Sequence, residues 1–373
     1  MKILQVLIIS WFSFQSFAAD NLVLVTIDGL RWQEVFTGAD PQLIDNKDFV
    51  QHPATLKQQY WHTDPTQRRA LLMPFLWQTV IKQGRIIGNR QNNSQMRVSN
   101  DMYFSYPGYS EIFTGVADPS IDSNKKFNNP QVTFLEWLSA QKTAYKTNAL
   151  FGSWDVFPFI VNQQRSKLHV NAGFQAAEGY AVSEHGQWLN NLQQQIPSPW
   201  HNVRLDAFTQ GFALDYLKQV QPRVMIIAYG ETDDFAHGGH YDQYLSSAHR
   251  TDKFIADLWQ QLQSMPQYKN NTTLLITTDH GRGSNSDDWQ HHASKKASNG
   301  YLQQTNRFPE GILGSEHIWL AAIGPDISPK GEVATGKEVL QKQIAATALS
   351  LLGEDYKKFN PAAGKPIMEI IQP

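Results

Sequence analysis

Acidic and histidine side chains follow three short apolar segments of the chain, at the points where predicted strands end. The segments are residues 22–27, 223–229 and 273–278, and the side chains after them are Asp28, Asp233, His237, Asp279 and His280. Carboxylate and neutral imidazole are ligands that suit zinc, and manganese or iron can occupy the same set. The residue types therefore indicate a metal site.

Each of these residues also has a simpler explanation when it is taken alone. An Asp after a strand commonly caps a helix or completes a turn. Asp233 and His237 are four residues apart, which suits one face of a helical turn but is also common by chance. Asp279, His280 and the glycine after them could form a plain turn. Their joint occurrence after three strands is what favours a metal site.

Predicted strands alternate with predicted helices along the chain. The strands are expected at 22–27, 145–150, 223–229, 273–278 and 318–323, and the helices at 68–82, 132–140, 206–220, 245–263 and 337–352. Such alternation predicts an α/β fold with a mainly parallel central sheet and helices on both faces. Ligands bind beyond the carboxyl ends of the strands in such sheets. Residues 155–205 and 283–313 are rich in Gln, Asn, Ser and Gly, and we expect them to form loop insertions over that edge.

The composition is that of a globular chain. Of 373 residues, 41% are hydrophobic and 18% are charged, which allows a sizeable core. The formal net charge of -2 provides no bulk attraction to nucleic acid, so no nucleic-acid-binding surface is expected. The absence of cysteine excludes thiolate zinc sites and a cysteine nucleophile. We expect a single catalytic domain over residues 19–373 and leave its oligomeric state open.

The first 18 residues have the layout of a secretory signal peptide. Lys2 supplies a positive charge, residues 3–14 are largely apolar, and the small residues Ser16 and Ala18 provide a cleavage site. An uncleaved membrane anchor is the alternative, but the apolar run is short for a span of ~20 residues. No later stretch is long and apolar enough to cross a bilayer. The mature protein is therefore expected to be periplasmic or secreted, without a membrane span.

Five segments in a fixed order resemble the alkaline phosphatase superfamily, and most closely its nucleotide pyrophosphatase/phosphodiesterase branch. These segments are residues 25–31 (VTIDGLR), 105–115 (SYPGYSEIFTG), 231–237 (ETDDFAH), 277–281 (TTDHG) and 314–317 (GSEH). They span most of the mature chain. Their combination is specific to the superfamily, whereas it says little about the substrate. The resemblance implies an alkaline phosphatase-like fold and the hydrolysis of phosphate esters.

The resemblance also implies two metal sites around one nucleophile. The first is formed by Asp28, Asp279, His280 and the hydroxyl oxygen of Ser105, and the second by Asp233, His237 and His317. Ser105 resembles the family's nucleophile, which is threonine in most of the diesterase branch. Two divalent metal ions are expected, with zinc favoured by the ligand types. The expected reaction passes through a phosphoserine at Ser105.

Two positions depart from the diesterase branch. Gly108 stands where that branch usually has an asparagine that contacts phosphate, and Tyr109 stands where it often has histidine. Tyr109 also replaces the arginine that sulfatases with a serine precursor have at this place, which argues against a sulfatase. The phosphate contact must therefore come from another residue, and the preference between monoesters and diesters is left open.

Several other polar or aromatic residues have both a structural and a functional interpretation. Arg31 could hold a phosphate oxygen or form a salt bridge, and His240 could contact substrate or lie on the surface. His291 and His292 lie in a polar segment, which favours solvated side chains. Trp154 could line a pocket wall or simply pack.

The expected substrate is a small-molecule phosphate ester, and the expected reaction is its hydrolysis. One alternative is a sulfate or phosphonate ester hydrolase on the same scaffold. A second alternative is a non-catalytic, metal-stabilised binding protein. The complete set of ligand-type residues together with Ser105 counts against the binding protein.

Overall fold

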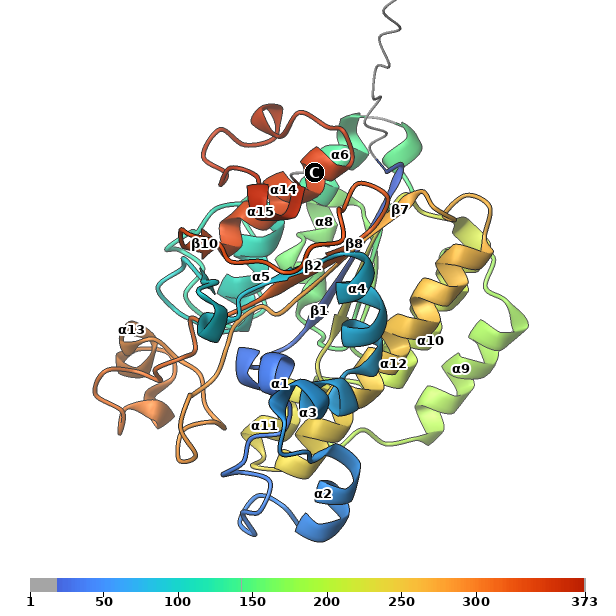
Figure 1. The fold of residues 1–373 in the computed structure, drawn as a ribbon. Helices are drawn as coiled ribbons and strands as arrows, with labels where there is room; N and C mark the ends of the chain where they lie inside the picture. Colours follow the sequence, from blue (N-terminus) through green and yellow to red (C-terminus); the bar gives the residue numbers. More distant parts are fainter. Residues whose placement is uncertain (1–18, 142, 372–373) are drawn as a thin grey trace, which may run out of the picture.

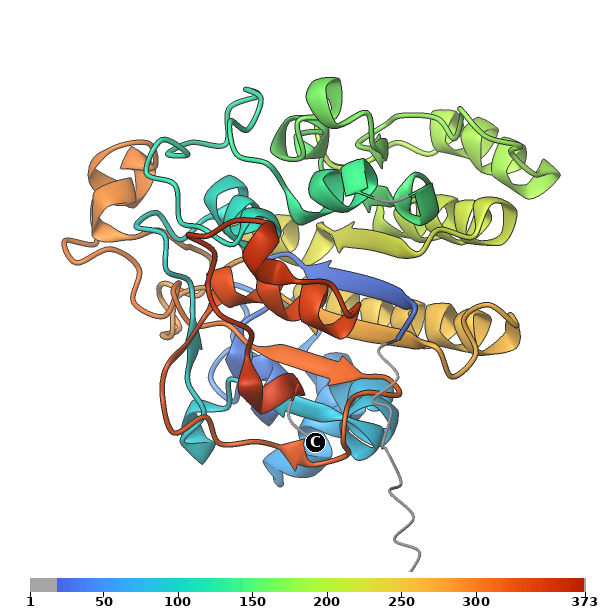
Figure 2. The ribbon, with the colours of Figure 1, turned by 90° about the horizontal axis from the view of Figure 1, so that it is seen from above.

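An eight-stranded sheet runs through the centre of the molecule, with helices on both of its faces (Figures 1 and 2). The computed structural model describes residues 19–141 and 143–371, so the predicted signal peptide lies outside the described residues. In spatial order the strands are β5 (His169–Ala172), β4 (Ala149–Gly152), β6 (Val224–Tyr229), β1 (Asn21–Ile27), β7 (Thr272–Thr277), β8 (Leu320–Ile323), β2 (Arg85–Ile87) and β9 (Gly331–Glu332). Only β8 runs antiparallel to its neighbours within this sheet. The predicted α/β fold with a mainly parallel sheet is therefore confirmed.

The helices form a layer on each face of the sheet. One layer contains α1 (Trp32–Thr37), α2 (Pro53–Tyr60), α3 (Pro65–Leu72), α4 (Ile81–Gln83), α9 (Glu184–Gln195), α10 (Asp206–Val220), α11 (Glu231–His237) and α12 (Tyr241–Ser264). The other contains α5 (Ser105–Thr114), α6 (Phe134–Gln141), α7 (Phe157–Ile160), α14 (Ile344–Leu351) and α15 (Met368–Ile371), with α8 (Gln163–Ser166) following α7. Helix α13 (Lys295–Asn299) lies apart from both layers (Figure 1).

Short elements complete the chain. Strands β3 (Met96–Arg97) and β10 (Val339–Leu340) form a separate two-stranded sheet. A π-helical turn covers Leu76–Val80, and 3-10 turns cover Arg90–Asn92, Thr143–Tyr145, Gln303–Thr305, Gln341–Gln343 and Tyr356–Lys358. None of the helices in the described part of the chain has the length and apolar character needed to span a bilayer.

Strand β1 is the centre of the core. All seven of its residues are buried, and its side chains alternate between the two hydrophobic clusters on either side of the sheet. Val23 and Val25 pack into the cluster that includes α12, whereas Leu22 and Leu24 pack into the cluster that includes α5. A parallel strand that is covered on both faces has no face exposed to water. This explains the continuous apolar run in the sequence.

Several predicted element boundaries are wrong, each for a local reason. The helix predicted at 68–82 is interrupted after α3, where Pro74 disfavours a continuous helix, and resumes as the π-helical turn and α4. Only the second half of the helix predicted at 337–352 is helical, since β10 and a 3-10 turn come first. The strand predicted at 145–150 is β4, which begins four residues later.

The expectation that residues 155–205 are only a loop insertion is also wrong. This segment contributes β5 at the edge of the sheet and the twelve-residue helix α9. Strand β5 has only four residues, one of them Asn171, so its apolar pattern is too short to read. The sequence also gave no signal for α5, a fully buried helix that begins at Ser105.

Shortening a side chain of β1 should destabilise the whole fold. We expect Leu24→Ala to lower the free energy of unfolding by about 2–5 kcal/mol, because it leaves a cavity in a fully buried position. Leu313→Ala is the matched control, since Leu313 is 60% exposed and its truncation should cost less than about 0.5 kcal/mol. Urea unfolding followed by circular dichroism measures both, and equal losses would contradict the central role of β1.

Candidate active site

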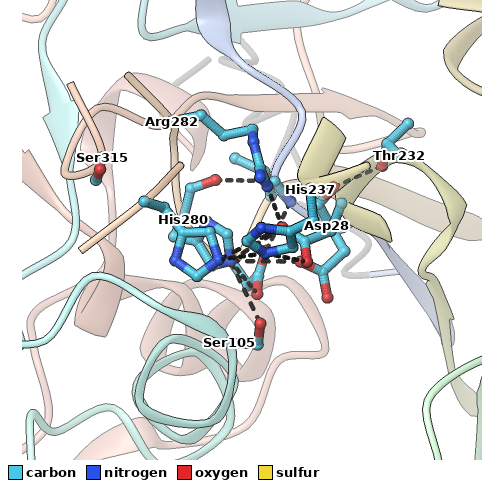
Figure 3. A network of polar contacts seen from close by, with 12 residues as sticks. Asp28, Ser105, Thr232, His237, His280, Arg282 and Ser315 are labelled. Carbon is cyan, nitrogen blue, oxygen red and sulfur yellow. Dashed lines mark hydrogen bonds and ion pairs between the residues drawn. The ribbon is translucent and has the colours of Figure 1, made fainter. Parts of the chain in front are cut away.

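Three neighbouring parallel strands bring the predicted acidic residues to one edge of the sheet. Strand β1 lies between β6 and β7, and the register pairs Ile27 with Tyr229 and Thr26 with Thr277. The three strands therefore end almost level, and the residues that follow them meet. Figure 3 shows the resulting cluster, in which Asp28, His237, His280 and Arg282 surround one space beside Ser105.

The first group of candidate ligands consists of Asp28, Asp279 and His280. Their ligand atoms all lie within 4.8 Å of one another. His280 Nε2 is 3.4 Å from Asp28 Oδ1 and 3.5 Å from Asp279 Oδ2. The hydroxyl of Ser105 lies 3.3 Å from the same nitrogen, as the dashed lines in Figure 3 indicate. The predicted first site, including its serine oxygen, is therefore brought together.

The polar atoms of this group fit a cation. Asp28 Oδ1 and Asp279 Oδ2 are buried and lack a hydrogen-bond partner among the described residues. Leaving a buried carboxylate oxygen unpaired is costly, and a bound cation removes that cost. His280 Nδ1 faces the carbonyl oxygen of Gly281 at 2.8 Å. In the neutral ring, an N–H donated there leaves Nε2 unprotonated and directed at the two carboxylates, as a metal ligand requires.

Buried charges of one sign shift the pKa values in this cluster. Burial, and then the charges of neighbouring aspartates, raise the pKa of Asp28 and hold that of Asp279 well above its usual range. Burial lowers the pKa of His280, but the charges of Asp279, Asp28 and Asp233 outweigh it and raise that pKa to about 9. A divalent cation would reverse these shifts by favouring the deprotonated ligands.

The second group of candidate ligands is centred on Asp233. Asp233 and His237 lie on one face of α11, with His237 Nε2 3.1 Å from Asp233 Oδ2. His292 Nε2 lies 3.0 Å from His237 Nε2 and 3.6 Å from Asp233 Oδ1. His292 Nδ1 faces the carbonyl oxygen of Tyr103 at 3.1 Å, which directs Nε2 to the group. Asp233, His237 and His292 therefore offer one carboxylate and two imidazoles.

Among the described residues the imidazole of His292, and not that of His317, contacts Asp233 and His237, while the predicted ligand role of His317 stays a prediction. The imidazole of His317 lies 3.2 Å from Glu316 Oε1. It belongs to neither of the two clusters of ligand atoms that the described residues form, Asp28–Asp279–His280 and Asp233–His280–His292. His292 was expected to be solvated, but it is only 4% exposed. The reason is the path of residues 283–313. The Gly283 N–H donates to the carbonyl oxygen of His291 and Trp289 packs into the core, so that the ring of His292 lies against that of His280, with 3.9 Å between the centroids. The available signal was a histidine twelve positions after His280.

Ser105 is the first residue of α5 and is 6% exposed. The positive end of the helix dipole lies at this position and favours an anionic oxygen. Gly108, one turn later, packs against the backbone of Asp279, and a Cβ there would lie 2.4 Å from the Asp279 carbonyl oxygen. This close approach explains why no asparagine side chain can stand at Gly108. It also fixes Ser105 beside the first group.

The amide missing at Gly108 has a counterpart in Asn124. Asn124 lines the pocket of about 510 Å³ that also contains Ser105, Asp28 and Asp233. Its Oδ1 accepts a hydrogen bond of 2.9 Å from the backbone N–H of Tyr106. This bond orients the amide and leaves its NH₂ group to donate to a ligand. Sequence reasoning missed Asn124 because it lies nineteen positions after Ser105 and reaches the pocket through a segment of irregular structure.

Several neighbours hold the ligands in place. The hydroxyl of Tyr109 lies 3.2 Å from Asp28 Oδ2, to which it donates. Arg282 forms a buried ion pair with Asp233. Burial acts to raise the pKa of Asp233, but the charges of His237 and Arg282 outweigh it and hold that pKa well below its usual range. Thr232 donates a hydrogen bond of 2.5 Å to the carbonyl oxygen of Asp28, which ties α11 to the end of β1.

The remaining alternatives are also resolved by geometry. Arg31 is fully buried in an ion pair with Glu34 and donates to the carbonyl oxygen of Gly283, so it forms the salt bridge and is not a phosphate ligand. His240 is exposed and precedes α12. Trp154 lines the pocket. Burial and the charges of Asp233 and Asp28 raise the pKa of another pocket residue, Asp234, to about 9.

Solved structures with a similar fold are hydrolases and a synthase of one superfamily. The alkaline phosphatase PafA superposes with a TM-score of 0.58 at 12% identity, over 95% of this chain and 99% of that chain. A phosphonate monoester hydrolase from Silicibacter pomeroyi gives a TM-score of 0.54 at 14% identity, over 94% and 76%. The lipoteichoic acid synthase LtaP from Listeria monocytogenes gives 0.54 at 10% identity, over 94% and 75%. At these identities the likeness establishes the fold alone.

The family is established by the sequence match itself. No curated protein matches the chain closely enough to count as a relative. The model of the type I phosphodiesterase/nucleotide pyrophosphatase family matches residues 35–306, which is well over half of the chain. The superfamily includes hydrolases of phosphate and sulfate esters, and its members typically use divalent metals. The chain therefore belongs to the type I phosphodiesterase/nucleotide pyrophosphatase family of the alkaline phosphatase superfamily.

Proposed function

We propose that the protein is a metal-dependent phosphoric ester hydrolase with Ser105 as its nucleophile. The observation that supports this most directly is the Ser105 hydroxyl, 3.3 Å from His280 Nε2, beside two buried carboxylate oxygens that have no hydrogen-bond partner within the described part of the chain. Two divalent metal ions are part of the proposal, and zinc is the metal that the ligand types favour. Asp28, Asp279 and His280 would hold one ion with Ser105, and Asp233, His237 and His292 the other.

When bound, the metal ions supply positive charge that stabilises the serine alkoxide and the phosphoryl oxygens. The Ser105 oxygen attacks phosphorus, the ester P–O bond breaks, and the alcohol leaves with a proton. Water then attacks the phosphoserine and releases phosphate and the free Ser105 hydroxyl. The NH₂ group of Asn124 and the N-terminus of α5 are placed to stabilise the charge on the phosphoryl group.

The substrate in this proposal is a small-molecule phosphate ester, and the pocket of about 510 Å³ is of a suitable size. Export to the periplasm or the medium remains a prediction based on residues 1–18. Assays with p-nitrophenyl phosphate, bis-p-nitrophenyl phosphate and p-nitrophenyl sulfate, with and without chelator, separate the candidate activities. Turnover of the sulfate alone would favour a sulfatase, and chelator-insensitive background on all three would favour a binding protein.

Removing the nucleophile should abolish turnover but leave the metal in place. We expect Ser105→Ala to lower kcat by about 10³-fold or more, while metal content stays close to that of the wild type because the carboxylates and imidazoles remain. Ser110→Ala is the matched control, since Ser110 lies in the same helix but its hydroxyl accepts a hydrogen bond from Asn129. Retained turnover in Ser105→Ala, measured on the most active substrate, would remove Ser105 from the mechanism.

The two histidines that compete for the second site can be told apart by metal analysis. We expect His292→Ala to lose about one of two bound metal equivalents after dialysis, whereas His317→Ala keeps both. The reason is that only His292 lies within 4 Å of Asp233 and His237 among the contacts of the described residues. Inductively coupled plasma mass spectrometry gives the metal content. Loss of metal from His317→Ala alone would restore the assignment implied by the family resemblance.

Metal binding should stabilise the protein more at pH 9 than at pH 6. A group whose pKa is raised by folding adds stability below its unfolded pKa and loses it as pH rises towards the folded value. For His280 this window runs from 6.5 to about 9, and the raised pKa values of Asp28 and Asp279 act in the same direction. The metal-free protein therefore becomes less stable as its ligands deprotonate, which is when metal binds best. Differential scanning calorimetry of both forms gives the Tm shift, and a larger shift at pH 6 would contradict the ligand assignment.

A further inference from the structure

One buried carboxylate close to the site has no part in the proposed chemistry. Glu111 lies in α5, six residues after Ser105, and is fully buried. Burial raises the pKa of Glu111, although hydrogen bonds from Ser99 and Asn100 act to lower it. A carboxylate that is removed from water is tolerated only where other groups satisfy its oxygens. The groups that do so here show what Glu111 holds in place.

The oxygens of Glu111 accept hydrogen bonds from two segments that are distant in the sequence. Oε2 accepts from the backbone N–H of Asn100 at 2.8 Å and from its side-chain amide at 2.9 Å. Oε1 accepts from the hydroxyl of Ser99 and from the backbone N–H of Lys342, the latter at 2.9 Å. All of these groups donate, which suits an ionised carboxylate because it can only accept. Glu111 therefore fixes Ser99 and Asn100 against α5.

Asn100 transmits this fixed position to Tyr103. The Oδ1 atom of Asn100 accepts from the backbone N–H groups of Met102 and Tyr103, both at 3.0 Å. Such an Asx turn orders the backbone that follows the asparagine. Tyr103 has a φ of 59°, a left-handed conformation that is uncommon for a bulky residue. A backbone of this kind persists only where its surroundings hold it, and here Asn100 does so.

The turn at residues 100–103 in turn carries the segment that contains His292. The carbonyl oxygen of Tyr103 faces His292 Nδ1 at 3.1 Å. The carbonyl oxygen of Met102 accepts from the backbone N–H of Ser294 at 3.0 Å, and that of Asp101 accepts from the Ser294 hydroxyl. These three contacts fix both the backbone and the ring orientation of His292. The direction of its Nε2 atom therefore depends on the turn.

We propose that Glu111 is a positioning residue that holds His292 in the second group of candidate ligands through Asn100 and Tyr103. The inference rests on the proposed metal-dependent hydrolysis and identifies a residue that keeps one of its metal ligands in place. In this role Glu111 contacts neither substrate nor metal. Changing the outer partners of a metal-binding histidine typically costs about 10- to 100-fold in metal affinity. A Glu111 variant should therefore bind one ion more weakly, and excess metal should compensate.

Zinc titration of the metal-free protein against a competing chelator tests this role without reference to activity. Glu111→Gln keeps the size of the side chain but directs an NH₂ group at groups that themselves donate. We expect this variant to bind one of two zinc ions about 10- to 100-fold more weakly and the other within about threefold of the wild type. Asn100→Ala should show the same selective loss, because it removes the acceptor that holds Tyr103. If Glu111→Gln does not fold, the Asn100→Ala titration decides alone.

The zinc dependence of turnover gives a second measurement on the same variants. At zinc concentrations that saturate the wild type, Glu111→Gln should turn over p-nitrophenyl phosphate slowly. Its kcat should return to within about threefold of the wild-type value when zinc is raised by about 10- to 100-fold, since the second ion is then bound again. Turnover that stays low at every zinc concentration would contradict a role through metal binding.

Asp252→Asn is the matched control for a general loss of stability. Asp252 is also a buried carboxylate, and it accepts from the backbone N–H groups of Phe75 and Leu76 at 2.7 and 2.8 Å. It belongs to neither ligand group and does not line the pocket beside Ser105. We expect Asp252→Asn to lower the urea midpoint of unfolding, as Glu111→Gln does, but to keep both zinc affinities.

The outcomes separate this inference from the proposed function. Wild-type zinc affinities in Glu111→Gln and Asn100→Ala would overturn the positioning role and leave the hydrolase standing. An equal loss of affinity in Asp252→Asn would also overturn it, because stability alone would then explain the effect. A wild-type protein that binds two zinc ions but hydrolyses no ester would overturn the hydrolase, while the titrations would still decide the role of Glu111. A wild-type protein that binds no second ion would overturn both.

Discussion

The structure is organised around a concentration of buried negative charge that the protein neutralises only in part, through the ion pair of Arg282 with Asp233. Asp28, Asp233 and Asp279 follow three adjacent parallel strands, and the register of those strands leaves the carboxylates no room to separate. Like charges in a poorly solvated space repel strongly, and the repulsion can be relieved by protons or by bound cations. The core that surrounds β1 therefore holds together an arrangement that is unfavourable until a ligand completes it.

The residues around this cluster are arranged to preserve its geometry. Nδ1 atoms of His280 and His292 face backbone carbonyl oxygens, so both rings direct Nε2 inwards. Tyr109 donates to Asp28 Oδ2, and Arg282 pairs with Asp233 Oδ1, the oxygen that also lies 3.6 Å from His292 Nε2. The departures from the diesterase pattern fit this picture. Gly108 allows α5 to lie against Asp279, and Asn124 brings an amide to the same pocket from another part of the chain.

Sequence patterns predicted the parts of the molecule that long buried runs determine. Strands β1, β6 and β7 are continuous apolar runs, and their ends correctly located Asp28, Asp233 and the pair Asp279–His280. Strand β5 was not predicted because four residues are too few to show a periodic pattern. The helix that begins at Ser105 was not predicted because all of its residues are buried, so apolar and polar positions do not alternate with the helical period. The choice between His292 and His317 depended on how residues 283–313 travel through space. No local pattern encodes that path. Trp289, which lies three residues before His292, is buried in the core.

The position of His292 in residues 283–313 has a consequence for how that segment would respond to a bound metal ion. Two of the three ligands in its group come from the rigid helix α11, whereas the third comes from a covering segment that must fold back to deliver it. Any ion bound there contributes its binding free energy to the closed form of that segment and none to an open form. Scarcity of metal would thus loosen the cover of the pocket before it unfolds the sheet, and susceptibility to proteases would report the loading state of the protein.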